Sequence, residues 1–173
     1  MTLILRVTCA VLIGLMIVEC GNKSFANVDG VQIVDGAILS LVDGTRNPMV
    51  DDTKRKSMAA DIVAAGVKHD VPILLITAII YKESSFKTDA KGSLGEVGLM
   101  QVHGVARRGC DTNSQYGQID CGASWLAVGK AKCGTVRGAI TAYATGRCKP
   151  GSNRVVRVVN ARVRLWKKLR GDG

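Results

Sequence analysis

The chain has 173 residues, which is enough for one domain of ordinary size but not for two enzymatic domains. Its 24 Lys and Arg residues outnumber 14 Asp and Glu residues, so the formal net charge is +10. Such a charge attracts polyanions, namely nucleic acid, anionic lipid or the anionic polymers of a bacterial wall.

Residues 1–26 have the features of an export signal. Arg6 precedes an apolar run at 7–18, and the segment ends with the small-x-small sequence Ser24-Phe25-Ala26. The sequence therefore predicts cleavage after Ala26 and a periplasmic or secreted protein. A retained segment that anchors the protein in the membrane is the alternative. Export makes nucleic acid the least expected of the three polyanions.

The cysteines fit an exported protein. The four that remain after cleavage are Cys110, Cys121, Cys133 and Cys148. An even number in an oxidising compartment predicts two disulfides. A zinc site is not expected, because no CxxC pair occurs and both histidines, His69 and His103, lie far from the cysteines in sequence. No metal or cofactor is predicted.

Residues 27–50 are rich in turn formers and contain "VDG" three times at irregular spacing. This composition predicts a loosely ordered N-terminal arm, with at most a short helix at "AILSLV". Residues 51–173 are expected to form the functional domain.

Two helices are predicted next. An amphipathic helix begins near Asp52 or Thr53 and places Met58, Ile62 and Ala65 on one face. The second is "ILLITAIIYKES", residues 73–84, which is apolar nearly all round and therefore typical of a buried helix. Asp70 is a plausible cap for it.

The second half also predicts helices. A short helix is expected at 99–106, then a loop at 107–120, then a helical hairpin formed by 120–132 and 135–146 with its turn at Cys133-Gly134. A last helix covers 153–169. No convincing strand follows the arm, so we expect an all-α domain of five to seven short helices, with at most a small hairpin near the glycine-rich loop.

The last helix is basic and amphipathic. Its apolar face contains Val155, Val159, Trp166 and Leu169, and the rest carries Arg154, Arg157, Arg164, Lys167 and Lys168. The favoured interpretation is a terminal helix that packs on the domain with a solvated outer face. Attraction to a membrane surface or to the wall is the alternative.

Glu83 is the most unusual acidic residue. The chain has three glutamates, and only Glu83 lies between a buried helix and a glycine-rich turn. A helix C-terminus disfavours a carboxylate, and an apolar pocket would raise the pKa of Glu83 further. A carboxylic acid that stays protonated near neutral pH can protonate a glycosidic oxygen. The plainer alternative is a glutamate that accepts hydrogen bonds from its own loop.

Three ordered motifs carry a family resemblance. "DVPILLITAIIYKESSF", "GSLGEVGLMQV" and "GAITAYATG" together resemble the soluble-type lytic transglycosylase domain, which is related to goose-type lysozyme, over about residues 52–146. The resemblance implies a lysozyme-like helical fold with a glycosidase cleft. It implies cleavage of the bond between N-acetylmuramic acid and N-acetylglucosamine in peptidoglycan, giving 1,6-anhydro ends, with Glu83 as the single general acid and base.

The same resemblance assigns supporting roles in substrate binding. Ser84 would hydrogen-bond near the acid, and Gly98 would let the backbone approach the sugar. Met100 and Gln101 would line the site, with Gln101 contacting an acetamido group or the glutamate. Tyr143 would hold the glutamate or the reacting sugar. Without the family match, these residues would be interpreted as core filler, a surface amide and a packed ring.

One position departs from the family. The family commonly has A-Y-N-A-G, whereas this chain has Ala142-Tyr143-Ala144-Thr145-Gly146. A polar contact from the asparagine is therefore missing at Ala144, which bears on substrate positioning more than on the reaction class.

Other functions stay open. A goose-type-lysozyme-like hydrolase needs a second positioned carboxylate, and the candidates, Asp89 and Glu96, are both expected to be solvated loop charges. A non-catalytic wall-binding protein and a membrane-active protein are further alternatives. The expected substrate is the peptidoglycan glycan strand, bound by a monomer. A secretion, conjugation or phage apparatus is a candidate partner.

The disulfide pairing has three possibilities. A Cys133 to Cys148 bond would span about ten helical residues, roughly 15 Å, whereas bonded cysteines have Cα atoms within about 7 Å. This favours Cys121 with Cys148 and Cys110 with Cys133. If the hairpin is built differently, the local pairs return, Cys110 with Cys121 and Cys133 with Cys148.

Overall fold

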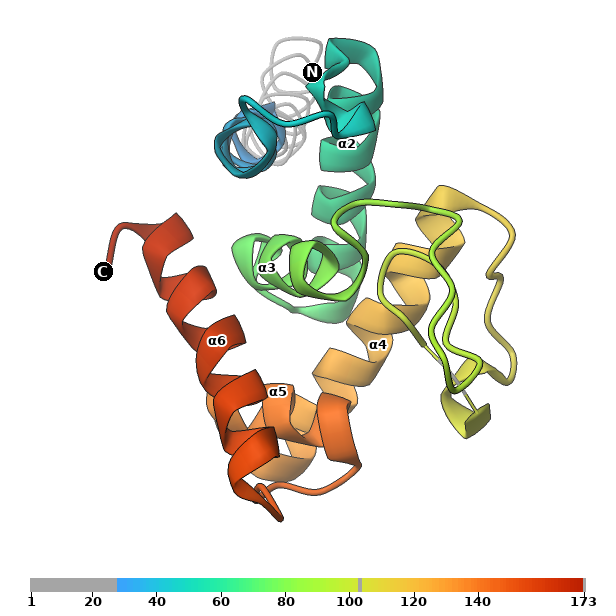
Figure 1. The fold of residues 1–173 in the computed structure, drawn as a ribbon, viewed down its shortest axis with the longest axis vertical. Helices are drawn as coiled ribbons and strands as arrows, with labels where there is room; N and C mark the ends of the chain where they lie inside the picture. Colours follow the sequence, from blue (N-terminus) through green and yellow to red (C-terminus); the bar gives the residue numbers. More distant parts are fainter. Residues whose placement is uncertain (1–27, 103, 173) are drawn as a thin grey trace, which may run out of the picture.

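The computed structural model describes residues 28–102 and 104–172, which form helices around one central helix (Figure 1). Residues 28–42 are helical, and the later elements are η1 (Pro48–Val50), α2 (Asp52–His69), α3 (Ile73–Ser84), η2 (Gly104–Arg107), α4 (Gln115–Cys133), α5 (Val136–Thr145) and α6 (Asn153–Arg170). In the described residues, β-structure is confined to isolated bridges, from Lys91 to Val97 and from Val97 to Val102. The predicted all-α fold is confirmed. The predicted export signal at 1–26 lies outside the described residues.

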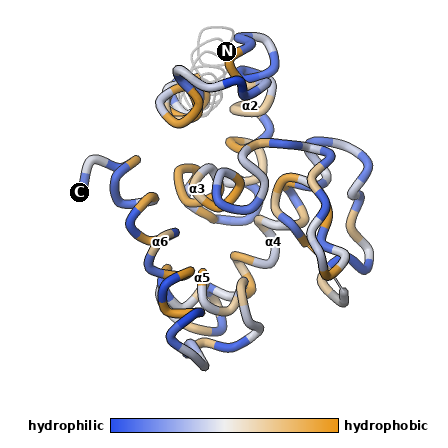
Figure 2. The backbone as a smooth tube through the Cα atoms, in the orientation of Figure 1, coloured by the Kyte–Doolittle hydropathy of each residue, from blue (hydrophilic) through white to orange (hydrophobic). Residues whose placement is uncertain are grey.

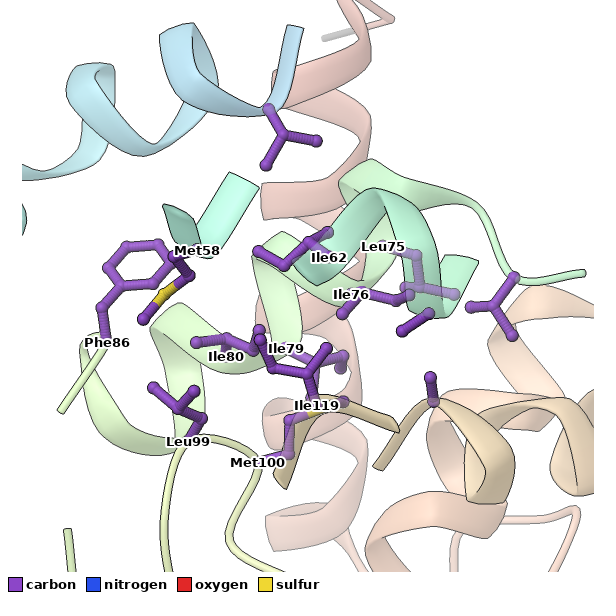
Figure 3. Close-up of a cluster of buried hydrophobic side chains, with 14 of the residues drawn as sticks. Met58, Ile62, Leu75, Ile76, Ile79, Ile80, Phe86, Leu99, Met100 and Ile119 are labelled. Carbon is purple, nitrogen blue, oxygen red and sulfur yellow. The ribbon is translucent and has the colours of Figure 1, made fainter. Parts of the chain in front are cut away.

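Helix α3 is the centre of the core. Figure 1 shows it in the middle of the molecule, between α2, α4 and α6, and Figure 2 shows hydrophobic residues along much of its length. Its side chains Ile76, Ile79 and Ile80 are fully buried. Figure 3 shows them gathered with Met58 and Ile62 of α2 and with residues of the following loop. The buried helix that the sequence predicted is therefore the element on which the others pack.

Helix α2 begins and ends at clear signals. The Asp51 carboxylate accepts a hydrogen bond from the Lys54 amide and caps the first turn. At the other end Asp70 has left-handed backbone angles and donates its amide N–H to Gly66. Asp70 therefore closes α2, and α3 begins after Pro72 without a side-chain cap. The expected N-cap role of Asp70 is wrong.

The N-terminal segment is better ordered than its composition predicts. Residues 28–42 form a helix whose side chains Val34, Ile38 and Val42 are buried in the core. Arg55 of α2, itself buried, pairs with Asp35 at 2.7 Å. The predicted loose arm at 27–50 is thus wrong over 28–42, because apolar residues four apart provide a packing face that outweighs the low helix propensity of the glycines.

Two boundaries in the second half differ from the prediction. Residues 99–102 form turns and a bridge instead of a helix, and only the short η2 follows. Helix α4 starts at Gln115, five residues before the predicted start, with the Ser114 hydroxyl capping Gly117. Gly117 occurs here because a Cβ would lie 2.3 Å from the Asp111 carbonyl oxygen, so this glycine permits close packing and not a turn.

All four cysteines form disulfides, as predicted, but in local pairs. The bonds are Cys110 with Cys121 and Cys133 with Cys148, whose Cα atoms are 5.6 and 5.3 Å apart. The favoured pairing is wrong because the chain after α5 returns to the end of α4, where the Lys132 ammonium group donates to the Gly146 carbonyl at 3.2 Å. A Cβ on Gly138, one turn into α5, would lie 2.6 Å from the Cys133 Cβ. The chain that turns back at Gly146 therefore brings Cys148 within reach.

Helix α6 packs on α3 and α5. Val159 is fully buried, and Val155, Val163 and Trp166 pack against the core around it. The arginines and lysines of the predicted charged face, Arg154, Arg157, Arg164, Lys167 and Lys168, are exposed. The helix is therefore a packed terminal helix with a charged outer face, and it brings one further arginine to the site described next.

Candidate functional site

Glu83 lies in the last turn of the buried helix α3. Its side chain is 16 % exposed, so the carboxyl group lies at the edge of the core and still meets solvent. After Ser84 the chain leaves the helix through Ser85 and Phe86, which both have positive φ. The Phe86 ring is buried, and the Asn47 amide donates to the Ser85 carbonyl at 2.7 Å. These contacts hold a turn that is unfavourable for residues with a Cβ and thereby fix the helix end at Glu83.

Arg162 of α6 binds the Glu83 carboxylate. Its Nη2 donates to Oε1 at 2.6 Å and its Nε donates to the same oxygen at 3.1 Å. The Arg162 side chain is 13 % exposed, so the pair is largely shielded from water. A cation here offsets the unfavourable interaction of a carboxylate with a helix C-terminus.

The sequence pattern contained a signal for this partner. Arg162 lies three residues after Val159 and four before Trp166, so it falls on the apolar face of α6. A charged residue on a buried helix face needs a partner of opposite charge.

Tyr143 reaches the site from α5. Its hydroxyl donates a 2.5 Å hydrogen bond to the Met100 carbonyl. Burial and then the negative charge of Glu83 raise the pKa of Tyr143 well above its usual range, against the opposite effect of Arg162. The hydroxyl group therefore lies close enough to Glu83 and Arg162 to sense both charges, and it keeps its proton.

The Gly98 to Gln101 motif builds the loop beside the site. The side chain of Met100 is fully buried, and a Cβ on Gly122 of α4 would lie 2.3 Å from its sulfur. Met100 is therefore a core residue, and only its carbonyl reaches Tyr143. A Cβ on Gly98 would lie 2.3 Å from Oε1 of Gln118, so the missing Cβ leaves room for that amide.

Two more predicted residues bond within their own segments. The Gln101 side chain donates to the carbonyls of Gly98 and Ala90 at 2.8 and 3.2 Å. The Ser84 hydroxyl is buried and donates to the Ile80 carbonyl, one turn back in α3. Within the described residues, neither side chain is hydrogen-bonded to Glu83. Of the predicted residues, the structure brings together Glu83, Tyr143 and the Met100 carbonyl.

A pocket of about 470 Å³ has Tyr143 in its wall. It is lined by Gln101, Val102, Ala106, Trp125 and residues 142–146. The Trp125 indole is 37 % exposed, and its Nε1 donates to the Ala106 carbonyl at 2.8 Å. This bond fixes the ring in the pocket wall, where a flat aromatic face can pack against a sugar ring.

The wall of this pocket contains the departure from the family pattern. Ala144 lines it and is exposed, so no amide is offered where the family has asparagine. The sequence alone does not indicate that Trp125 lines this pocket, because the position of its ring depends on how α4 crosses the loop at 101–106.

The two candidate second carboxylates lie in the loop. Glu96 accepts a hydrogen bond from the Leu94 amide at 2.9 Å and lies against Gly92. Asp89 is exposed and lines a separate small pocket with Lys91 and Arg107. Glu96 thus has a role within the loop, and Asp89 is surrounded by polar residues at the surface.

Comparison with protein families gives a match to one model. Residues 61–155 match the transglycosylase SLT domain, and this range includes Glu83, the loop motif and Tyr143. No curated protein matches the chain. In the described residues, no helix is long and apolar enough to cross a membrane. The matched range covers more than half of the 173 residues, and the chain therefore belongs to the transglycosylase SLT domain family.

Proposed function

We propose that this protein is a peptidoglycan lytic transglycosylase in which Glu83 is the single general acid and base. The observation that carries the proposal is the position of Glu83: a shielded carboxyl group at the end of α3, whose charge acts on the Tyr143 hydroxyl, in a chain of the SLT family. Tyr143 also lines the pocket, so it connects the carboxyl group with the space where sugars would bind.

The proposed reaction has two proton transfers at one carboxyl group. Glu83 first donates its proton to the glycosidic oxygen that links N-acetylmuramic acid to N-acetylglucosamine, and the bond from the anomeric carbon to this oxygen breaks. The Glu83 carboxylate then takes the proton of the muramyl 6-hydroxyl group as that oxygen attacks the anomeric carbon. The product is a 1,6-anhydro sugar, and no water is consumed. One group can serve both steps because they follow one another at the same place.

The pocket supports binding of the glycan strand. We assign Trp125 and Tyr143 as the aromatic residues that pack against sugar rings, with Gln101 at the pocket edge. Ser84, Gly98 and Met100 support these residues by holding the α3 end and the loop. With Ala144 in place of asparagine, substrate orientation depends more on ring packing than on a side-chain amide.

We further propose that the protein acts outside the cytoplasm as a monomer. Its two disulfides are suited to an oxidising compartment. The predicted export signal would direct the protein to the periplasm or out of the cell, or would hold it at the membrane if the signal is retained as an anchor. Its positive charge favours attraction to the anionic wall. A secretion, conjugation or phage apparatus would be the partner that brings the protein to the part of the wall where it acts.

Digestion of purified sacculi followed by mass spectrometry tests the function. We expect 1,6-anhydro ends with the natural protein, loss of at least about 100-fold in rate with Glu83→Gln, and little change with the charge-matched control Asp89→Asn. Reducing ends, together with loss of activity in Asp89→Asn, would identify a hydrolase with two carboxylates. Equal clearing by the natural protein and Glu83→Gln would show that Glu83 is not the catalyst.

A further inference from the structure

The contact between Arg162 and Glu83 is one-sided. Both donors, Nη2 and Nε, point at Oε1, while the third nitrogen, Nη1, donates to the Val158 carbonyl at 3.2 Å. Within residues 28–102 and 104–172, Oε2 of Glu83 accepts no hydrogen bond from another side chain or from the backbone. The two oxygens of this carboxyl group are therefore not equivalent.

This arrangement is compatible with both protonation states of Glu83. A protonated carboxyl group carries its hydrogen on one oxygen and accepts hydrogen bonds on the other. An arginine that bridges both oxygens would leave no place for the proton without losing a bond, as in the usual bidentate pair. Here the proton can reside on Oε2 while Oε1 keeps both donors.

Arg162 is itself held in place. Its bond to Val158 ties the guanidinium to its own helix, and Val159 and Trp166, one turn before and one turn after it, pack into the core on the same face of α6. The Arg162 side chain is 13 % exposed, and removing the guanidinium would leave Glu83 shielded without a partner. Arg162 lies beyond the residues 61–155 that match the family model.

We infer that Arg162 is a positioning residue that holds Oε1 of Glu83 through the whole reaction, so that Oε2 is the oxygen that gives and retakes the proton. The inference rests on the proposed function. In the first step the O–H bond of Oε2 breaks and its proton goes to the leaving oxygen, which keeps the electron pair of the broken glycosidic bond. In the second step Oε2 takes the proton of the 6-hydroxyl group, whose oxygen bonds to the anomeric carbon.

The positioning matters because one oxygen acts twice. If the carboxyl group turned between the two steps, its basic oxygen would no longer face the 6-hydroxyl group, and water could reach the anomeric carbon instead. The two donors on Oε1 oppose this rotation, and the positive charge stabilises the carboxylate that exists between the steps. Tyr143 of α5 is the other titratable group whose charge interaction with Glu83 the structure shows, and it stays neutral.

The test compares Arg162→Met and Arg162→Lys with Arg164→Met. Arg164 lies on the same helix, is exposed and has no ion pair in the described part of the chain, so its replacement removes one positive charge without touching Glu83. For each variant, kcat and KM on solubilised glycan strands, the pH profile, the ratio of anhydro to reducing ends and the melting temperature are measured.

We expect Arg162→Met to lower kcat by about 10- to 100-fold with KM changed less than about threefold, as for loss of alignment at the reacting group. The fraction of reducing ends should rise. Arg162→Lys should recover only part of kcat, because an ammonium group cannot supply the two fixed donors.

Three results would overturn the inference. The first is a kcat for Arg162→Met equal to that of Arg164→Met. The second is a lowered kcat that tracks a lowered melting temperature with an unchanged product ratio, which marks a purely structural role. The third applies if Arg162→Met does not fold. Arg162→Lys then decides, and a kcat of Arg162→Lys equal to that of the natural protein would overturn the inference. The absence of anhydro ends with the natural protein would instead reject the proposed function.

Discussion

The Tyr143 hydroxyl donates a 2.5 Å hydrogen bond to the carbonyl of Met100, and this bond joins helix α5 to the loop beside Glu83. The two residues are 43 positions apart in the sequence. The bond therefore couples the pocket wall to the loop that covers the end of α3, and its loss should be measurable in both stability and pH response.

Tyr143→Phe should lower the free energy of unfolding by about 1–3 kcal/mol at neutral pH, because the Met100 carbonyl loses its partner. The natural protein should also lose stability as pH rises above about 10, since Tyr143 ionises only in the unfolded state while its raised pKa keeps it protonated in the folded state. Tyr143→Phe removes this part of the pH dependence. Urea unfolding from neutral to alkaline pH measures both effects, with the exposed Tyr116→Phe as control. Parallel pH curves for the natural protein and Tyr143→Phe would contradict the prediction.

The helix at 28–42 should contribute to global stability. Ile38 is fully buried, so Ile38→Ala should cost about 2–5 kcal/mol. Ile33 in the same helix is 53 % exposed, and Ile33→Ala should stay within about 0.5 kcal/mol. Chemical denaturation of both variants gives the comparison. Equal small effects would mean that this helix is not part of the cooperative core.

Gly98 should be more sensitive than its neighbour Gly95. Both have positive φ, but a Cβ at Gly98 would also overlap the Gln118 amide, whereas nothing lies within 4 Å at Gly95. Gly98→Ala should destabilise by about 2–4 kcal/mol, and Gly95→Ala by about 1 kcal/mol from backbone strain alone. Thermal unfolding separates the two. Similar losses would show that the Gln118 side chain moves aside at little cost.

Trp125 should affect substrate binding more than the reaction step. Because its ring lies in the wall of the pocket, Trp125→Ala should raise KM about tenfold, equivalent to about 1.4 kcal/mol of binding, with a small change in kcat. Val128→Ala, another exposed apolar residue of α4, is the control. Steady-state kinetics on glycan strands, with melting curves for both variants, decide. An unchanged KM would remove Trp125 from the proposed substrate path.

The sequence was most informative where one simple pattern dominated. Residues 73–84 are apolar on nearly every side, and such a segment can only be a buried helix, so its position and that of Glu83 at its end were predictable. The disulfides were predictable as a number, because four cysteines in a chain with a predicted export signal are expected to pair up. Their partners were not, because pairing depends on the angle at which α4 crosses α5.

The missed features depend on packing between segments distant in sequence. Gly36 and its neighbours suggested turns at 28–42, yet this segment is a helix whose side chains Val34 and Ile38 are buried in the core. Gly117 lies in the predicted loop at 107–120, whereas in the structure it lets Asp111 approach α4 closely. Arg162 is one of many basic residues of α6; its place on the apolar face distinguishes it from them, but its partner Glu83, 79 positions earlier, is known only from the fold.

The Cys133 to Cys148 bond encloses the whole of helix α5, including Tyr143, in a covalent ring. Besides this bond, α5 is held to α4 by packing, such as Gly129 against Ala139, and by the hydrogen bond from Lys132 to the Gly146 carbonyl. Forming the disulfide reduces the conformational freedom of the unfolded chain on both sides of Tyr143. Reduction is therefore expected to destabilise the part of the fold that carries Tyr143.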